Sequence, residues 1–132
     1  MTAHTFTISG HLPGLNEYID ACRRHAQIGG RMKREHQDMV VREIMCAILS
    51  HRFPAHIDGP VRLRYRFVEP NKRRDKDNIS GFAHKVIQDA LVQVGVLKGD
   101  GWGYVEGSMD EYEVDKERPR IEVTVEEVDK DG

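Results

Sequence analysis

The fold is decided by Val61-Arg-Leu-Arg-Tyr-Arg-Phe-Val68 and, after a short loop, by Ile79-Ser-Gly-Phe-Ala-His-Lys-Val-Ile-Gln-Asp-Ala-Leu-Val-Gln-Val94. In the first segment apolar residues hold every second position, which is the pattern of a β-strand with one buried face. In the second, apolar residues recur at intervals of three and one, which gives a helix of about four turns one continuous apolar face. Gly95 follows, where a helix commonly ends. These two segments predict a strand that leads into a packed helix.

The N-terminal half adds a strand and two helical segments. Phe6 and Ile8 alternate with polar residues in a short strand. Helical spacing predicts a segment over residues 17–25, a break at Gly29-Gly30, and a long amphipathic helix over residues 32–52.

The C-terminal part predicts a β-hairpin, with strands over residues 104–114 and 120–128 joined around residues 116–119. We therefore predict the α+β class, with a small mixed β-sheet packed against helices. A single domain spans residues 1–132, and residues 129–132 are expected to form a frayed tail. A chain of 132 residues is long enough to bury a core without disulfides or structural metals.

Composition is that of an ordinary soluble domain, with 39% hydrophobic and 32% charged residues. No apolar run reaches the roughly 20 residues of a membrane span, and no basic segment followed by an apolar one opens the chain. We therefore expect a cytoplasmic protein with no membrane contact, in which Cys22 and Cys46 stay reduced. A zinc site that combines these cysteines with His25 and His36 lacks the paired short spacing of zinc modules, so we set it aside.

Charge is distributed unevenly around a net value of −2. Residues 1–109 carry 16 Lys and Arg against 12 Asp and Glu, whereas residues 110–132 carry 4 against 10. Residues 62–76 contain seven basic and two acidic side chains. Such a patch is able to bind phosphates even on a slightly acidic protein, since charges interact over only about 8–10 Å at physiological salt. A compatible alternative is that the arginines of residues 62–66 form the solvated face of the strand.

The loop between the strand and the helix reads Arg73-Arg74-Asp75-Lys76-Asp77-Asn78. In an extended segment Asp75 and Asp77 project to the same side from Cα atoms about 6–7 Å apart, so both are able to bind one cation. Mg²⁺ prefers oxygen ligands and is usually held by one or two carboxylates plus substrate phosphates. The alternative is a solvated charge cluster that pairs with itself. Asp77, Asn78 or Ser80 is expected to cap the helix.

A third acid, Asp100, lies between Gly99 and Gly101 after the helix. The glycines suit either a tight surface turn or an acid turned back toward a metal. On the polar face of the helix, Lys85 and Asp89 have the i,i+4 spacing of an ordinary surface ion pair. Neither feature alone selects a function.

Three further side chains have both a structural and a functional interpretation. Trp102 and Tyr104 are expected to pack against the long helix, and stacking on an unpaired base is the alternative. His84 is expected to be a solvated helix residue, and a proton carrier is the alternative.

The order of these pieces resembles the RusA family of Holliday-junction resolvases. The match covers residues 73–100 and consists of a basic R-R-D-x-D-N loop, a helix with K-x-x-x-D-A-L, a glycine, and then an acid. Residues 13–18, Pro-Gly-Leu-Asn-Glu-Tyr, also look like the family's opening P-x-x-N-x-Y. The resemblance implies a homodimeric, Mg²⁺-dependent endonuclease that nicks paired strands at four-way DNA junctions and is often encoded by phages or prophages.

The resemblance also assigns roles to particular residues. The metal-binding catalytic acids would be Asp75, Asp77 and Asp100. Lys85 would be the catalytic lysine, although the family's usual lysine position is Gly81 here, which implies an insertion of about one helical turn. If the segment is helical throughout, Lys85 lies about 12 Å along the axis from Asp77, and a non-helical start would bring it closer. Gly99 stands where the family often has a further acid.

We therefore predict a crossover junction endodeoxyribonuclease that resolves Holliday junctions by symmetric paired nicking in DNA recombination and repair. It would use one or two Mg²⁺ per active site, with Mn²⁺ as a substitute, and no organic cofactor. The cations predicted to hold the DNA backbone are Lys72, Arg73, Arg74 and Lys76. Two alternatives stay open: a non-catalytic dimer of the same fold that binds branched DNA, and a nuclease directed to flaps or forks.

Overall fold

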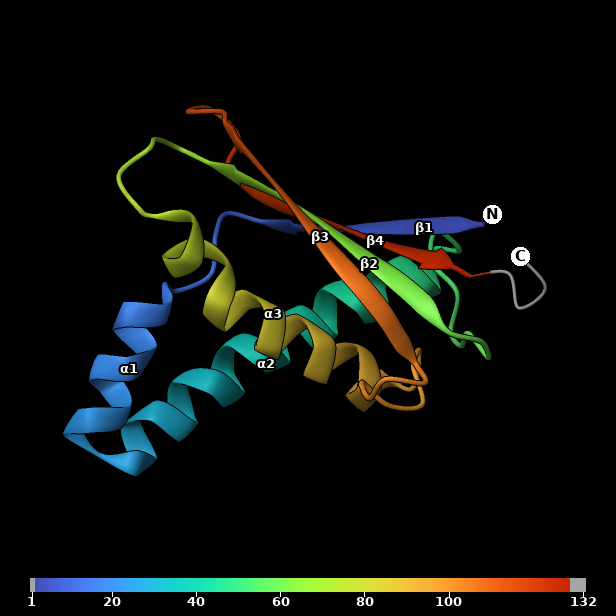
Figure 1. Cartoon of the computed structure of the whole chain (residues 1–132), viewed down its shortest axis with the longest axis horizontal. Helices are drawn as coiled ribbons and strands as arrows, with labels where there is room; N and C mark the ends of the chain where they lie inside the picture. The colour runs from blue at the N-terminus through green and yellow to red at the C-terminus, as the bar shows by residue number, and fades with distance from the viewer. Residues whose placement is uncertain (1, 129–132) are drawn as a thin grey trace.

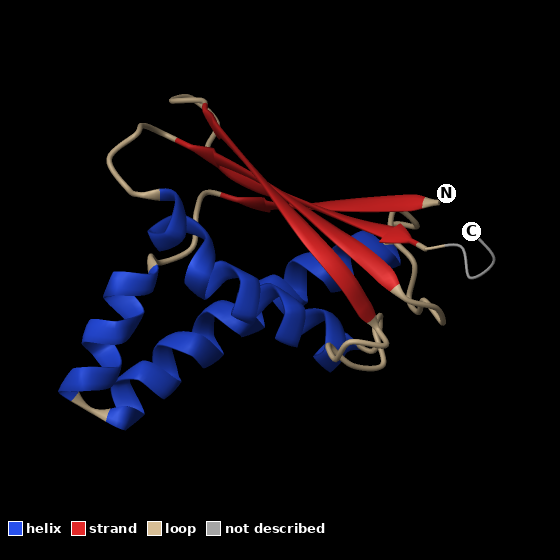
Figure 2. Ribbon diagram, in the orientation of Figure 1, coloured by secondary structure: helices blue, strands red, loops and turns tan. Residues whose placement is uncertain are grey.

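A four-stranded mixed β-sheet with helices on one face is the framework of the molecule (Figure 1, Figure 2). This arrangement comes from a computed structural model, which describes residues 2–128. The elements in chain order are β1 (Ala3–Ser9), α1 (Leu15–Arg24), α2 (Ala26–Leu49), β2 (Val61–Glu69), α3 (Lys76–Val94), β3 (Val105–Val114) and β4 (Arg120–Glu127). The predicted α+β class with a small mixed sheet is confirmed, and the expected frayed tail, residues 129–132, lies outside the described residues.

The strands are arranged in the order β1-β4-β2-β3. β2 and β3 are parallel neighbours, and α3 forms the crossover that parallel strands require. β4 runs antiparallel to both β1 and β2 and lies between them. The predicted hairpin of β3 and β4 is therefore wrong, because β2 separates the two strands. β4 suits an inner position since Ile121, Val123 and Val125 are buried, whereas β3 has no fully buried residue and forms an edge.

β2 and α3 supply much of the hydrophobic core. Val61, Leu63, Tyr65 and Phe67 of β2 are all buried, as their alternation predicts. α3 lies on the same side of the sheet and crosses α2 (Figure 1). Its buried apolar residues are Ile79, Phe82, Ala83, Val86, Ile87, Ala90 and Leu91. The helix ends at Gly95, which has the left-handed φ of +94° that glycine adopts without strain.

The two N-terminal helices are separated at His25, and the break predicted at Gly29-Gly30 is wrong. His25 is extended, with φ −167° and ψ 138°, and its ring accepts a hydrogen bond from the Gln27 N–H at the start of α2. Gly29 lies inside α2, where that helix approaches Cys22 of α1. A Cβ at Gly29 would lie 2.4 Å from the Cys22 Sγ, so glycine serves close helix packing there.

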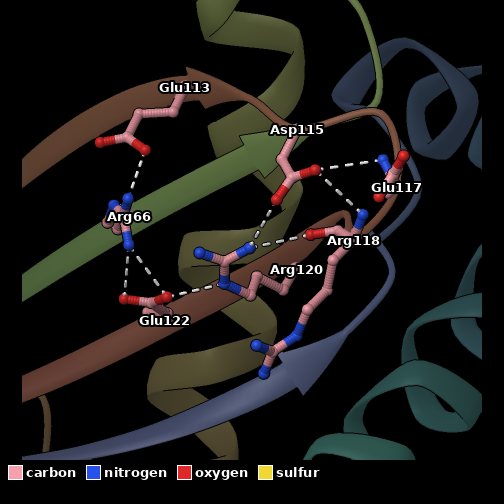
Figure 3. A network of polar contacts seen from close by, with 7 residues as sticks. All are labelled: Arg66, Glu113, Asp115, Glu117, Arg118, Arg120 and Glu122. Carbon is pink, nitrogen blue, oxygen red and sulfur yellow. Dashed lines mark hydrogen bonds and ion pairs between the residues drawn. The ribbon is translucent and has the colours of Figure 1, made fainter.

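The outer face of the sheet carries a lattice of Arg–Glu ion pairs. The arginines of β2 pair with glutamates of the neighbouring strands as Arg62–Glu106 (2.7 Å), Arg64–Glu126 (2.9 Å) and Arg66–Glu122 (3.0 Å). Figure 3 shows the network continuing from Glu122 to Arg120 and Asp115. The hydrogen bond from Arg120, followed by that from Arg66, lowers the pKa of Glu122. The solvated-face interpretation of the β2 arginines is confirmed, and glutamates of β3 and β4 balance their charge.

His56 joins the loop before β2 to the end of α3. Its Nδ1 lies 3.0 Å from the Gly95 carbonyl oxygen, and its Nε2 lies 2.7 Å from Oδ1 of Asp58. Both ring nitrogens therefore face acceptors, and only the protonated ring donates to both. The hydrogen bond to Gly95, followed by that to Asp58, raises the pKa of His56 above 6.5.

The structure also bears on the expectations for membrane contact and for the two cysteines. Within residues 2–128, no helix combines the length and the apolar character needed to cross a membrane. Cys22 and Cys46 are free thiols, as expected. The described part of the chain has no group of three or more His, Cys, Asp or Glu placed to hold a metal ion.

Candidate functional site

The acids of the D-x-D pair lie at the start of α3. Asp75 is the N-cap residue, with φ −64° and ψ 153°, and its carbonyl oxygen accepts a hydrogen bond from the Ile79 N–H (2.9 Å). Asp77 lies in the first helical turn, where the positive end of the helix dipole favours a carboxylate. The extended geometry predicted for both acids therefore holds for Asp75 alone. The capping position belongs to Asp75, and the prediction of Asp77, Asn78 or Ser80 is wrong.

Both carboxylates line an open depression of about 1030 Å³. Its walls are the β2–α3 loop, the first turn of α3 and the end of β3, and its polar lining includes Lys72, Lys76 and Tyr112. Asp75 and Asp77 are exposed, and none of the ion pairs within residues 2–128 involves either of them. Their oxygens are therefore available to a ligand from solvent.

Arg74 of the same loop is held inside the protein. Its guanidinium forms a bidentate pair with Glu69 at the end of β2, with both N–O distances at 2.9 Å, and donates to the Leu12 carbonyl oxygen (3.0 Å). Glu69 is 5% exposed, so the pair is largely shielded from water. Arg74 thus fixes the loop to β2 and to the segment before α1. Lys72 and Arg73 are exposed, and their DNA-binding role stays a prediction.

Asn78 joins the loop to the start of α1. Its Oδ1 accepts a hydrogen bond from the Asn16 N–H (2.8 Å), one of the N–H groups that a helix N-terminus leaves without a helical partner. Gly14 makes room for this contact, since a Cβ there would lie 2.6 Å from the same oxygen. The two segments that resemble the RusA pattern, residues 13–18 and 73–78, are therefore in direct contact.

A row of polar side chains links α3 to the edge strand β3. His84 Nε2 lies 2.7 Å from Oδ1 of Asp110, and the Tyr112 hydroxyl lies 3.4 Å from both Oδ2 of Asp110 and the Lys76 carbonyl oxygen. Burial, together with the charges of Asp110 and Asp77, raises the pKa of Tyr112. His84 is therefore a half-buried partner of Asp110 and not the solvated residue expected. Only the parallel pairing of β2 and β3, which brings Asp110 beside α3, reveals this row.

Lys85 does not join the D-x-D acids. α3 is helical without interruption from Lys76 to Val94, so Lys85 lies about 12 Å along the axis from Asp77. Its amine pairs with Asp89 (3.7 Å), one turn further from Asp77, and Asp89 also binds Lys33 of α2 (2.6 Å). A non-helical start that would shorten the gap does not occur in residues 76–94. The surface-pair interpretation of Lys85 and Asp89 is confirmed.

Asp100 lies at the opposite end of α3 from Asp75 and Asp77. α3 contains 19 residues, which corresponds to about 28 Å of helix, and the Asp100 loop follows its C-terminal end. Figure 1 shows this loop, in orange, at the far end of α3 from the β2–α3 loop. The three predicted metal ligands are therefore not brought together within one chain, in agreement with the lack of a three-acid cluster among residues 2–128.

The Asp100 loop presents Trp102 to solvent. Trp102 is 99% exposed, so its predicted packing against the long helix is wrong. Tyr104 is 40% exposed, and its ring lies over Gly99, where a Cβ would lie 3.0 Å from two ring carbons. The glycine that departs from the family pattern thus makes room for the tyrosine.

Comparison with known proteins assigns no family to this chain. A scan against protein-family models finds no match, and a search of curated proteins finds no similar sequence. The RusA resemblance therefore stays a prediction.

Proposed function

We propose that this chain forms a homodimeric, Mg²⁺-dependent endodeoxyribonuclease that nicks four-way DNA junctions. The observation that carries the proposal is the pair of exposed acids, Asp75 and Asp77, which line an open depression together with Lys72 and Lys76. Metal-assisted hydrolysis of a phosphodiester uses carboxylates that hold the metal, and nearby cations hold the phosphate. This part of the surface offers both.

The donor set fits Mg²⁺. This ion is usually held by one or two carboxylates, with substrate phosphates and water completing its coordination, so Asp75 and Asp77 are sufficient protein ligands from one chain. When bound, it would supply Lewis-acid activation of a water molecule and neutralise charge on the phosphate. Lys72 and Arg73 hold the DNA backbone, and Lys76 adds positive charge within the depression.

Asp100 enters this site only from a second copy of the chain. About 28 Å of helix separates it from the acids of its own chain, which is far beyond the coordination shell of one ion. In a two-fold dimer with antiparallel α3 helices, the end of one α3 lies beside the start of the other, and two equivalent sites form. A four-way junction is also two-fold symmetric and needs two cuts, so such a dimer matches its substrate.

Asp77→Asn tests the metal site. We expect the variant to lose nicking of a synthetic four-way junction in Mg²⁺ while junction binding stays largely intact, because the amide keeps the shape of the carboxylate and loses its charge. Asp38→Asn, at an exposed acid on α2, is the matched control and should cut normally. Undiminished cleavage by Asp77→Asn would end the assignment.

A mixture of two inactive variants tests the shared site. Asp77→Asn and Asp100→Asn each damage both sites of their own homodimer. In a mixed dimer one site carries both substitutions and the other carries none, so refolding the two variants together should restore nicking at one site. If the mixture stays inactive although mixed dimers form, Asp100 does not act across the interface, and the requirement for Asp77 is unaffected.

The choice of lysine needs its own experiment. Lys76 lines the depression, whereas the Lys85 amine pairs with Asp89. We expect Lys76→Met to slow nicking far more than Lys85→Met, and junction affinity measured alongside separates the chemical step from DNA binding. The opposite order would show that Lys85 takes the role that the resemblance gives it, after a movement of α3 on DNA binding.

A non-catalytic junction-binding dimer is the second candidate function. The observation in its favour is the uninterrupted helix that places Lys85 about 12 Å along the axis from Asp77. Junction binding by the wild-type chain with no nicking in Mg²⁺ or Mn²⁺ would select it. Preferential nicking of flaps or forks in the same assay would instead select a flap- or fork-directed nuclease.

A further inference from the structure

Trp102 is a large apolar side chain that the fold leaves in water. It is 99% exposed, whereas tryptophan side chains are highly buried on average. It is also the single tryptophan of the chain. At 99% exposure the ring contributes almost no burial to the core of residues 2–128, so any role that it has lies outside the folded chain.

Backbone hydrogen bonds hold the turn around Trp102. The N–H groups of Tyr104 and Val105 both donate to the Gly101 carbonyl oxygen at 3.0 Å, and the Val61 N–H of β2 donates to the Tyr104 carbonyl oxygen at 2.9 Å. Trp102 therefore lies at the tip of a closed turn that is tied to the sheet. Because the backbone there is already ordered, less conformational freedom is lost when the ring binds a ligand.

The surroundings of Trp102 suit a flat ligand better than an apolar protein surface. A Cβ at Gly101 or Gly103 would meet no atom within 4 Å, so the space on both sides of the tip is open. Lys98 and Asp100, the exposed side chains that precede it, are charged. The buried centre of a stable protein interface is instead a contiguous, well-packed apolar patch.

We propose that Trp102 stacks on an unpaired base at the branch point of the DNA substrate. An isolated aromatic ring with accessible faces is what proteins use to stack on nucleobases in single-stranded DNA, and Lys98 supplies a cation four residues before it in the chain. This inference rests on the proposed function, in which Asp100 enters the metal site of the partner chain. Trp102 follows Asp100 by two residues, which span at most about 7 Å. The base that stacks is therefore close to the phosphate that is cut. Stacking of this kind favours branched DNA over duplex, since a base at a branch is unpaired at lower cost.

Fluorescence of the single tryptophan tests the contact directly. In the Asp77→Asn variant, which leaves the DNA whole, we expect saturation with a four-way junction to quench Trp102 emission by about half or more. Duplex of the same sequence should quench it much less. Gel shifts on the same samples measure binding independently, so full junction binding with unchanged emission overturns the stacking and leaves the nuclease proposal standing.

Two substitutions of Trp102 provide the second measurement. We expect Trp102→Ala to weaken junction binding about tenfold or more and Trp102→Phe to weaken it much less, because the phenyl ring still stacks. The slope of affinity against salt should stay unchanged, since no phosphate contact is removed. Leu49→Ala, at an exposed apolar residue of α2, is the control and should bind as the wild type does. Unchanged binding in Trp102→Ala, or equal losses in both Trp102 variants, overturns the proposal.

The outcomes distinguish this inference from the nuclease proposal. Quenching by junction DNA in a wild-type chain that never nicks supports stacking and refutes the nuclease. If the emission is quenched without DNA and the quenching increases with protein concentration, Trp102 lies in the contact between two copies of the chain. That result overturns the stacking proposal. Absence of any DNA binding refutes both.

Discussion

Glu69→Gln should destabilise the protein by about 2–4 kcal/mol. The Glu69 side chain is 7% exposed and accepts two 2.9 Å hydrogen bonds from the Arg74 guanidinium, which is 18% exposed. Removal of one partner of a fully buried ion pair costs about 3–5 kcal/mol, since the other charge is left uncompensated in a low dielectric. We lower this range because Arg74 keeps some solvent contact and its hydrogen bond to the Leu12 carbonyl oxygen.

Glu106→Gln is the matched control. Its pair with Arg62 has the same chemistry, but the two side chains are 44% and 48% exposed, and surface pairs of this kind contribute about 0.2–1 kcal/mol. Urea denaturation followed by circular dichroism measures the free energy of unfolding of both variants. A loss for Glu69→Gln that equals the loss for Glu106→Gln would refute the reasoning that burial makes the Arg74 pair strong.

A double variant separates the lost charge from lost packing. Glu69→Met together with Arg74→Met removes both charges and keeps most of the volume, so we expect most of the stability to return. If the double variant is as unstable as Glu69→Gln, altered packing and not an unpaired guanidinium is the cause.

Three other contacts give further predictions. Gly29→Ala should lower the stability by about 1–3 kcal/mol because its Cβ would overlap Cys22, whereas Gly30→Ala should raise it by about 0.5–1 kcal/mol. Thermal denaturation compares the two variants, and similar stability changes would contradict the close packing at Gly29. Asn78→Ala removes a hydrogen-bond acceptor at the start of α1 and should cost about 1 kcal/mol by the same measurement, and no loss would show that water replaces the side chain. His56 has a raised pKa, so its stabilising contribution is complete below its unfolded pKa of 6.5 and is lost as the pH rises through its folded pKa. The difference in urea midpoint between the wild type and His56→Gln should therefore be largest below pH 6.5 and shrink as the pH rises above it, and a constant difference would contradict the ring's charge-dependent role.

The spacing of apolar residues predicts those helices and strands that have one buried and one exposed face. β2 and α3 were predictable because each buries one continuous apolar face, and residues close together in the sequence are enough to reveal it. The strand that pairs with β4 was not predictable. The alternation from Ile121 to Val125 shows which face of β4 is buried, but it does not show which strand lies beside it. The pairing of Phe6 with Val123 joins opposite ends of the chain, beyond the range of any local pattern.

In the candidate site, too, some features were predictable from the local sequence and others depend on contacts in space. The exposure of the acids at the start of α3 was predictable, because they lie in a charged loop before a periodic helix, where a surface position is expected. Arg74 looks like its neighbour Arg73 in sequence, and only the approach of Glu69 and Leu12 in space makes it an internal residue. Glycine was ambiguous in the same way at Gly29, because a helix break and a close helix contact both require a small residue.

The Arg–Glu lattice restricts the direction from which a polyanion is attracted to this molecule. The arginines of β2 already have carboxylates at 2.7 to 3.0 Å, so a phosphate gains a partner on that face only by displacing a glutamate. Paired charges of opposite sign also cancel within a few ångströms of the surface at physiological salt. The broad face of the sheet therefore attracts a polyanion only weakly at long range. If the proposed function holds, a DNA backbone is attracted instead to the β2–α3 loop, where Lys72 and Arg73 are exposed.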